Sequence, residues 1–393
     1  MSNSSQNAGN KSELHSQGSN SSTRPHAEPL VLASVWECAS PAQADAILGK
    51  SMPGYVYQRD GHPNGDSLAN DLNRREGAAA GIVTSSGMAA LAAPLLAHVG
   101  AGDKVVFAKR LYGRTHVLAG DLRRLGVQVE LVDLQDLQAA RQGIAKGTKL
   151  VLVETIANPL LEVADVAPLA EISHAAGAIL LVDNTFASPP VCKPLSLGAD
   201  LVMESLTKTL NGHSDVILGY VGGSQQAFGK LATTVSTWGM SAGPFDCWLA
   251  HRGLATADLR IERSSQNALQ AAEFLSQQKV VKKVFYPGLP SHPGHALAKK
   301  QFSQGFGTMV TFELAGGRAA ADQFISAAKR IPFCPSLGEL NTTLSHPETT
   351  SHRGLTAQER EALGISGGTI RLSVGAEAAG EVAAMLAEGL AAI

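Results

Sequence analysis

One lysine lies directly behind two hydroxyl residues in the segment Ser205-Leu206-Thr207-Lys208, within an otherwise apolar stretch. A lysine amine becomes a Schiff-base nucleophile when partial burial keeps it deprotonated, and neighbouring hydroxyls can donate hydrogen bonds to a phosphate. An aldehyde and a phosphate occur together in pyridoxal 5'-phosphate (PLP). The alternative is a plain strand end whose lysine extends its charged head into solvent. The rest of the chain must therefore supply the other parts of a cofactor site.

Asp183 ends the strongest apolar run of the chain and precedes Lys208. A carboxylate in this position can pair with a protonated pyridine nitrogen and keep the ring cationic, so that the ring withdraws electrons. Taken alone, Asp183 could equally cap a following helix or bind a metal in a doubly wound sheet. Its occurrence with Lys208 favours the cofactor.

The segment Ser85-Ser86-Gly87-Met88 precedes an alanine- and leucine-rich helix that we expect to extend to His98. Amides at the start of a helix bind a phosphate dianion well, which makes Gly87 and Met88 candidate phosphate ligands. A serine N-cap with a glycine for a tight turn is the alternative. No Gly-x-Gly-x-x-Gly or Walker loop accompanies the segment, so a nucleotide is the less attractive source of phosphate.

Three further residues suit such a site. Tyr112 follows an apolar run, and its ring can stack on the pyridine while its phenol assists proton transfer. Asn158 follows another run and can hydrogen-bond the phenolic oxygen of the cofactor. Arg371 lies inside an apolar strand, where its planar fork suits a substrate carboxylate. The alternatives are a core or surface tyrosine, an Asn-Pro turn and an arginine paired with a glutamate.

The elements that must position these residues form an α/β domain. Short, nearly continuous apolar runs alternate with helical patterns between about residues 74 and 223, which is typical of buried strands in a mostly parallel sheet. Right-handed crossovers bring the site to the carboxyl ends of the strands. The predicted strands are 104–108, 127–132, 150–154, 178–183, 201–203 and 216–219.

Composition changes divide the chain into four segments. We predict a disordered tail at 1–28 and an arm at 29–65 that packs on another subunit, since neither shows a periodic apolar pattern. A large PLP-binding domain follows at 66–250. A smaller C-terminal α+β domain at 251–393 contains a long helix at 258–276 and strands at 308–313 and 369–374.

The composition limits the partners of the chain. The 393 residues are 44% hydrophobic and 17% charged, with a formal net charge of -2, so we expect no nucleic-acid interface. Four scattered cysteines give neither a disulfide framework nor a metal site. We see no membrane-spanning run and no signal peptide, and therefore expect a cytoplasmic protein whose partners are small molecules or other copies of itself.

With these residues in order, the chain resembles the Cys/Met-metabolism PLP enzymes. This family includes cystathionine γ-synthase, cystathionine γ-lyase, methionine γ-lyase and the O-acylhomoserine sulfhydrylases. The resemblance covers the chain after the tail and rests on residues 57–64, 85–90, 112–113, 158–161, 182–186, 205–208, 211–215, 336–338 and 370–375.

The resemblance implies a PLP-dependent transferase-like fold (fold type I) and a role for each matched residue. Lys208 is implied to form the Schiff base and to carry the catalysis together with Asp183, which pairs with the ring nitrogen, and Tyr112, which stacks on the ring. The residues implied to hold the phosphate are Gly87, Met88, Ser205 and Thr207, together with Tyr57 and Arg59, which reach across to a neighbouring subunit. A dimer is then the catalytic minimum, and a tetramer is usual.

Several positions depart from the family pattern. Glu204 replaces the usual histidine and Thr209 the usual tyrosine, and we expect neither to touch the chemistry. Arg114 stands where relatives often have glycine, so it could face an anionic distal group of the substrate or simply be a surface arginine. Asn341 stands where cystathionine-handling relatives commonly have glutamate. Asp60 stands where some succinyl-accepting synthases have arginine.

We therefore predict γ-elimination or γ-replacement on a homoserine-derived or sulfur amino acid, in trans-sulfuration or methionine metabolism. The alternatives within the family are a methionine γ-lyase, an O-acylhomoserine sulfhydrylase and a cystathionine β-lyase. Alternatives outside it are a PLP-fold protein that binds without turnover and a nucleotide-binding sheet protein. The predicted substrate-binding residues are Arg371, Ser336, Asn158 and Arg114.

Overall fold

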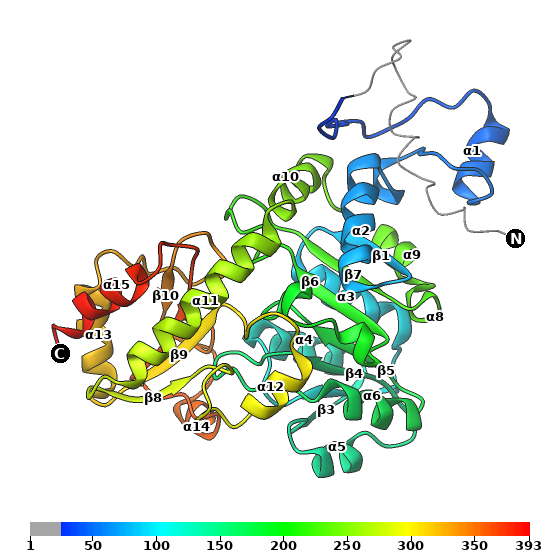
Figure 1. The fold of residues 1–393 in the computed structure, drawn as a ribbon. Coiled ribbons are helices and arrows are strands. Elements are labelled where there is room, and N and C mark those ends of the chain that lie inside the picture. Colours follow the sequence, from blue (N-terminus) through cyan, green and yellow to red (C-terminus); the bar gives the residue numbers. More distant parts are fainter. Residues whose placement is uncertain (1–24) are drawn as a thin grey trace, which may run out of the picture.

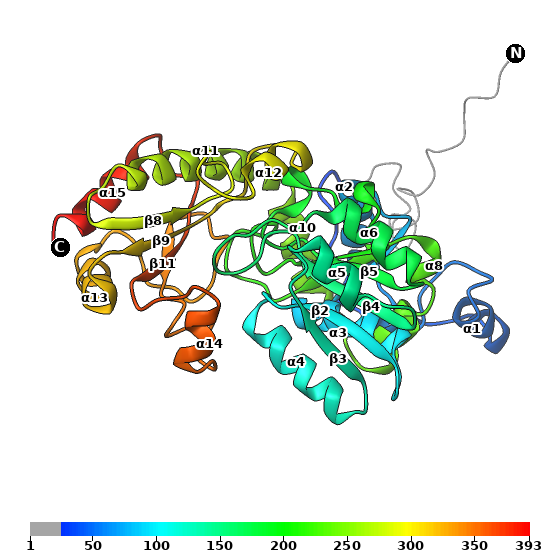
Figure 2. The same cartoon turned by 90° about the horizontal axis from the view of Figure 1, so that it is seen from below.

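The computed structural model describes residues 25–393, which form two bodies, each built around one sheet (Figures 1 and 2). Most of the predicted tail lies outside the described residues. The larger body contains a seven-stranded sheet and the smaller, C-terminal body a four-stranded one. The long helix α11 (Ala257–Ser276) extends from the first body along the second, as Figure 1 shows.

The seven-stranded sheet is mostly parallel, and this confirms the α/β fold class. β7 is antiparallel to both of its neighbours, and the other adjacent pairs are parallel. Because the parallel strands end at the same edge, their carboxyl ends gather the residues that follow them. In sheet order the strands are β1 (Ala80–Thr84), β7 (Gly219–Gly223), β6 (Leu201–Ser205), β5 (Ile179–Asp183), β4 (Thr148–Glu154), β2 (Lys104–Ala108) and β3 (Gln128–Val132).

The four-stranded sheet is antiparallel throughout. β11 lies inside it and is buried along its whole length, which takes the side chain of Arg371 out of water. In sheet order the strands are β10 (Thr343–Ser345), β11 (Thr369–Ser373), β9 (Met309–Leu314) and β8 (Val281–Phe285).

Helices cover both sheets, and apolar clusters join them to the strands. Within the described residues, no helix combines the length and the apolar character needed to cross a membrane. Besides α11 the helices are α1 (Pro41–Leu48), η1 (Gln58–Asp60), α2 (Pro63–Glu76), α3 (Gly87–His98), α4 (Gly113–Arg124), α5 (Leu137–Gly143), α6 (Val166–Ala175), α7 (Ser188–Val191), η2 (Pro194–Leu197), α8 (Gln225–Phe228), α9 (Leu231–Thr237), α10 (Pro244–Leu254), α12 (His295–Gln301), α13 (Gly317–Ala327), α14 (Ala357–Ala362) and α15 (Glu381–Leu390).

One predicted strand, 216–219, is wrong, because the strand begins at Gly219 and continues to Gly223. The apolar residues before it belong to no strand, and the amide of Leu218 donates to the Thr207 hydroxyl at 3.1 Å instead. The real strand is rich in glycine because its neighbours approach closely: a Cβ on Gly219 would lie 2.3 Å from the carbonyl oxygen of Ser86. Such a strand gives no apolar signal.

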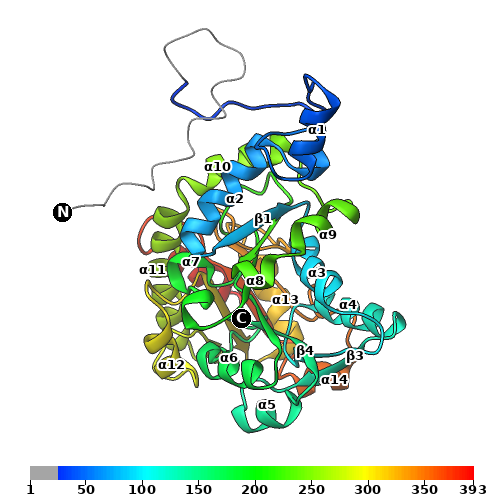
Figure 3. The ribbon, with the colours of Figure 1, turned by 90° about the vertical axis from the view of Figure 1, so that its right-hand side faces the viewer.

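The arm contains helix α1, which lies at the margin of the molecule beyond α2 (Figures 1 and 3). None of its residues is buried, so its sequence shows no apolar stripe. Ser40 caps its first turn by accepting from the amide of Gln43, and Pro41 starts it. A helix without a buried face in one chain is expected where another surface completes its packing.

Candidate active site

Three carboxyl ends of neighbouring parallel strands define the floor of the site. β4 ends at Glu154, β5 at Asp183 and β6 at Ser205. Glu154 and Asp183 stand directly across from each other in the ladder, so their side chains share one face of the sheet. Burial raises the pKa of Asp183, and hydrogen bonds from Thr185 partly offset this rise. An adjacent cation, such as a pyridinium, would favour the carboxylate form of Asp183 and lower its pKa again.

Lys208 lies in the turn that follows β6, and its side chain points toward the smaller body. Its Nζ donates to the Oγ of Ser336 at 2.9 Å. Burial lowers the pKa of Lys208, the positive charge of Arg371 lowers it further, and Glu339 opposes the change. A lysine with a lowered pKa has more of the neutral amine that attacks an aldehyde.

The start of α3 and the end of β6 form a cradle for an anion. Ser86 caps α3 by accepting from the amide of Ala89 at 3.1 Å, which leaves the first-turn amides of Gly87 and Met88 directed outward. A Cβ on Gly87 would lie 2.8 Å from the Oγ of Ser205, so only glycine lets the helix start approach this hydroxyl. The geometry fits a phosphate at a helix N-terminus.

The hydroxyl of Thr207, a predicted phosphate ligand, pairs with the backbone of Leu218 in this structure. The hydroxyl donates to the carbonyl oxygen of Leu218 at 3.3 Å and accepts from the Leu218 amide at 3.1 Å. This pairing braces the turn that carries Lys208. Any role of Thr207 toward a phosphate therefore requires the hydroxyl proton to leave Leu218, and the prediction stays open.

Arg371 is a buried cation without a carboxylate partner. It is 4% exposed, and burial lowers its pKa to about 10. Its Nη1 donates to the Oδ1 of Asn158 at 2.8 Å and its Nη2 to the carbonyl oxygen of Ser336 at 3.3 Å. Its Nε has no hydrogen-bond partner, and no carboxylate in the described part of the chain forms an ion pair with it. An arginine buried in this way is suited to an anionic ligand.

Asn158 turns its amide oxygen toward Arg371, so its Nδ2 remains available to the oxygen of a bound ring. Tyr112 is the N-cap residue of α4, after β2, and its side chain is partly exposed. Sequence reasoning assigned no role to the residue that connects these two. Glu154 accepts from the amide of Tyr112 at 2.6 Å and from the amide of Asn158 at 3.1 Å.

Glu154 is itself a strongly perturbed group. Burial, with a smaller contribution from the charge of Asp183, raises its pKa to about 8. The only sequence signal for it was its place at the end of an apolar strand. Because its partners are backbone amides, no side-chain pattern could reveal them.

Three predicted site residues stand apart from these contacts. Tyr57 and Arg59 contact each other, with the guanidinium carbon 5.1 Å from the ring centroid, and the carbonyl of Arg59 accepts from Ser241. Arg114 is exposed on the first turn of α4 and makes no hydrogen bond or ion pair to any other described residue. The arm residues thus complete no site within their own chain.

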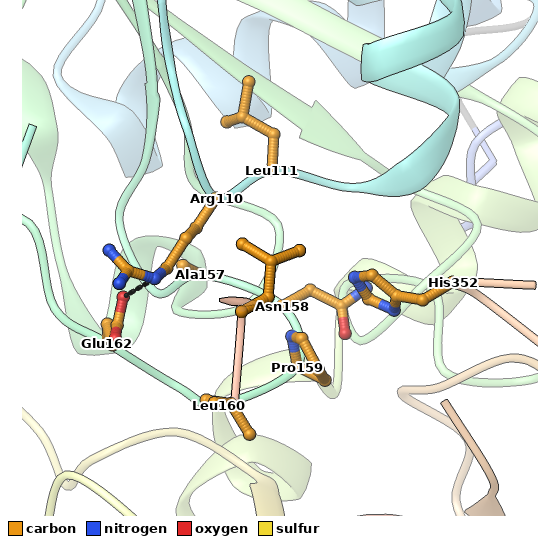
Figure 4. Close-up of a pocket in the computed structure, with 9 residues that line it drawn as sticks. Arg110, Leu111, Ala157, Asn158, Pro159, Leu160, Glu162 and His352 are labelled. Carbon is orange, nitrogen blue, oxygen red and sulfur yellow. Dashed lines mark ion pairs between the residues drawn. The ribbon is translucent and has the colours of Figure 1, made fainter. Parts of the chain in front are cut away.

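A small pocket lies beside Asn158, where the two bodies meet (Figure 4). Arg110 enters it from the larger body and His352 from the smaller one. The charge of Arg110 is neutralised, because its Nε lies 3.0 Å from Glu162 and its Nη1 donates to Asp133. Burial lowers the pKa of His352 to about 4, so the imidazole is neutral near pH 7. The pocket therefore offers no free charge.

A lysine with a lowered pKa, a buried strand-end carboxyl, a helix-start cradle and an unpaired buried arginine define a PLP-dependent enzyme that acts on amino acids. The residues present fit the cofactor at each of these points. The chain belongs to the Cys/Met metabolism PLP-dependent enzyme family, whose model matches residues 11–391.

Individual relatives cover nearly the whole chain. It is 39% identical over 369 residues to the O-succinylhomoserine sulfhydrylase of Pseudomonas aeruginosa, covering 94% of this chain and 91% of that one. It is 38% identical to an L-methionine gamma-lyase of Fusobacterium nucleatum, covering 93% of each. The cystathionine gamma synthase of Xanthomonas oryzae, solved with cystathionine, has a TM-score of 0.88 and 38% identity, covering 93% of this chain and 92% of that one.

Proposed function

We propose that this enzyme catalyses γ-elimination or γ-replacement on a homoserine-derived or sulfur-containing amino acid. One observation carries the proposal: Lys208 is hydrogen-bonded to Ser336, whose carbonyl accepts from the buried, carboxylate-free Arg371. A base and an anion site so connected suit a substrate with an α-proton beside an α-carboxylate. The relatives, named for O-succinylhomoserine, methionine and cystathionine, support the same class of substrate.

Bound PLP supplies an aldehyde for the substrate amine and an electron-withdrawing ring. The guanidinium of Arg371 holds the α-carboxylate, which fixes the Cα–H bond relative to Lys208. Lys208 takes the α-proton as the neutral amine, a state that burial favours. Asp183 keeps its negative charge beside the ring nitrogen.

Departure of the γ-substituent requires a second proton transfer. Once Lys208 has passed the α-proton on to the cofactor, its neutral amine can take a β-proton, and the substituent departs from Cγ with a proton donated by the phenol of Tyr112, which borders the site from the start of α4. In γ-replacement, a thiol then adds at Cγ and its proton returns through the same groups. In γ-elimination, water completes the conversion to a 2-oxo acid and ammonia.

Within this class we propose a substrate whose distal group is anionic, such as an acyl chain ending in a carboxylate. Arg114 supports this choice, because it is exposed two residues after Tyr112 and makes no hydrogen bond or ion pair within residues 25–393. Asn341 is exposed and uncharged, which argues against a distal ammonium as the best ligand.

A homo-oligomer with shared sites belongs to the same proposal. The arm residues Tyr57 and Arg59 make no contact with Lys208 or Asp183 in their own chain. We infer that they serve the site of a neighbouring subunit, in a dimer that pairs into a tetramer. We also propose a cytoplasmic location, which the scattered cysteines support.

The test is a substrate panel on the PLP-loaded enzyme: methionine, cystathionine, O-acetylhomoserine and O-succinylhomoserine, each with and without sulfide or cysteine. We expect 2-oxobutanoate without a thiol, a thioether or homocysteine with one, and the highest kcat/KM for O-succinylhomoserine. Pyruvate as the only product would overturn the γ-position. A visible cofactor band that no amino acid changes would indicate binding without turnover.

A further inference from the structure

The predicted reactive residues lie on one continuous path of hydrogen bonds. Lys208 donates to Ser336 at 2.9 Å, and the carbonyl of Ser336 accepts from Arg371 at 3.3 Å. Arg371 donates to Asn158 at 2.8 Å. The path starts after β6, crosses to β11 of the smaller body and returns to the loop after β4. It links the proposed base to the proposed carboxylate site.

Glu154 extends this path to Tyr112. One of its carboxyl oxygens accepts from the backbone amide of Asn158 at 3.1 Å, and the other accepts from the backbone amide of Tyr112 at 2.6 Å. The amides come from loops after two different strands, β4 and β2. A single side chain thus fixes two backbones, and each of these carries a predicted functional side chain.

We propose that Glu154 is a positioning residue of the reaction, which sets Tyr112 over the cofactor ring and Asn158 against Arg371 at the same time. The expected effect of Glu154 on turnover rests on the proposed function, whereas its hydrogen bonds do not. Only a carboxyl group can accept from both amides, since the NH2 of a glutamine would face one N–H with another donor. A shorter aspartate cannot reach both.

The position of Glu154 also gives it an electrostatic effect on the neighbouring Asp183. It lies in register with Asp183, on the same face of the sheet and next to the place of the ring nitrogen. Asp183 is among the causes of its raised pKa, after burial. Burial and Asp183 both disfavour a charge on Glu154, so the protonation of Glu154 is coupled to that of the carboxyl beside the ring nitrogen.

The experiment compares Glu154→Gln and Glu154→Asp with the wild type and with Glu162→Gln as the matched control. Glu162 lies in the loop that follows β4; its carboxylate pairs with Arg110 and takes no part in the path. Each protein is loaded with PLP. The measurements are the visible circular dichroism per bound cofactor, its dependence on pH, the thermal unfolding of apo and loaded protein, and steady-state kinetics on the best substrate.

We expect Glu154→Gln to lower kcat/KM on the order of 100-fold, with kcat reduced and KM raised, because a displacement of about 1 Å in a positioned group costs this much. The visible dichroism should weaken, and the pH at which the cofactor band titrates should shift. Glu154→Asp should recover part of both effects. Glu162→Gln should match the wild type.

Wild-type dichroism and kinetics in Glu154→Gln would overturn the proposal. So would a lowered unfolding temperature with unchanged dichroism and an unchanged ratio of kcat to KM, since that result describes a merely structural residue. Failure of the proposed function would look different, because the wild type would then turn over no amino acid of the panel. The dichroism of the variants would still decide the role of Glu154.

Discussion

At the scale of single residues, the burial of Arg371 supports the proposal that the site binds an anion. Its guanidinium has lost most of its hydration, and its hydrogen-bond acceptors are an amide oxygen and a carbonyl oxygen, with the Phe186 ring 6.0 Å away. Neutral acceptors offset less of the desolvation of a charge than a carboxylate does. The folded protein has thus already taken this charge out of water, which is why we propose a substrate carboxylate as its partner.

Arg114 should decide between acyl groups. We expect Arg114→Ala to raise KM for O-succinylhomoserine roughly tenfold, the effect of losing one charged hydrogen bond, while kcat and the KM for O-acetylhomoserine stay unchanged. Arg124→Ala, at the other end of α4, is the control. Equal effects on both substrates would remove Arg114 from the site.

Glu204, on β6, forms a buried acid pair with Glu76, the last residue of α2. Both are at most 1% exposed, and three of their four carboxyl oxygens have no hydrogen-bond partner. Burial raises the pKa of Glu76 to about 7, and burial together with Glu76 raises that of Glu204 well above its ordinary value. The folded protein therefore holds protons that the unfolded chain releases.

The pair should make stability fall as pH rises. The unfolded carboxyl titrates near 4.5 and folded Glu76 near 7, so stability is lost across this window. We expect Glu204→Gln, which needs no proton, to raise the unfolding temperature at pH 8 on the order of 2–4 °C and to change it little at pH 5. Thermal unfolding followed by circular dichroism at both pH values measures this. Parallel pH profiles of the two proteins would contradict the assignment.

At the scale of elements, the start of α3 depends on one glycine. Gly87 lets the first turn meet Ser205, where a Cβ would lie 2.8 Å from the side chain. We expect Gly87→Ala to raise the Kd for PLP roughly tenfold, because forcing a methyl group into a packed contact costs about 1–3 kcal/mol. Cofactor titration followed by fluorescence measures it.

The control for this substitution is Gly120→Ala, inside α4, where a new Cβ meets nothing within 4 Å. That variant should stabilise the helix slightly and leave PLP binding unchanged. If both variants bind PLP equally well, the start of α3 is not the phosphate cradle.

The sequence predicted elements well where burial produced a continuous apolar run, and poorly elsewhere. β2 begins and ends as predicted, at Lys104 and Ala108. The strand from Gly219 escaped prediction because close packing there demands glycine rather than apolar side chains. Lys208, Asp183 and Arg371 could be proposed from the sequence because the chemistry we assign to them depends on side-chain type. The role of Glu154 could not be predicted, because its partners are the backbone amides of Tyr112 and Asn158. Every residue except proline has such an amide, so the sequence gives no sign of these contacts.

At the scale of the whole molecule, the arm at residues 29–65 is the part whose role we place in a neighbouring subunit. Helix α1 buries no residue of its own, and Tyr57 and Trp238 are large side chains left 43% and 61% exposed. Such groups gather where another subunit covers them. We infer that this end of the molecule is where a second copy docks and exchanges its arm.

Subunit exchange tests this inference. Chains with Tyr57→Phe and Arg59→Ala, mixed with Lys208→Ala chains, should regain at most about one quarter of wild-type activity, because each heterodimer of a symmetric pair restores one intact site. Lys208→Ala mixed with Asp183→Ala is the negative control, since both of these residues belong to one chain's site. No recovery in verified heterodimers would contradict a shared site.

The hydrogen bonds from Lys208 to Ser336 and from Arg371 to Asn158 join two separately built cores. The proposed base, Lys208, therefore lies in the larger body, and the proposed carboxylate ligand, Arg371, lies in the smaller one. A small rotation of one body against the other would separate them while both hydrophobic cores stayed intact. If Lys208 and Arg371 act as proposed, catalysis depends on how the two bodies are docked and needs no strand or helix to unfold when it is lost.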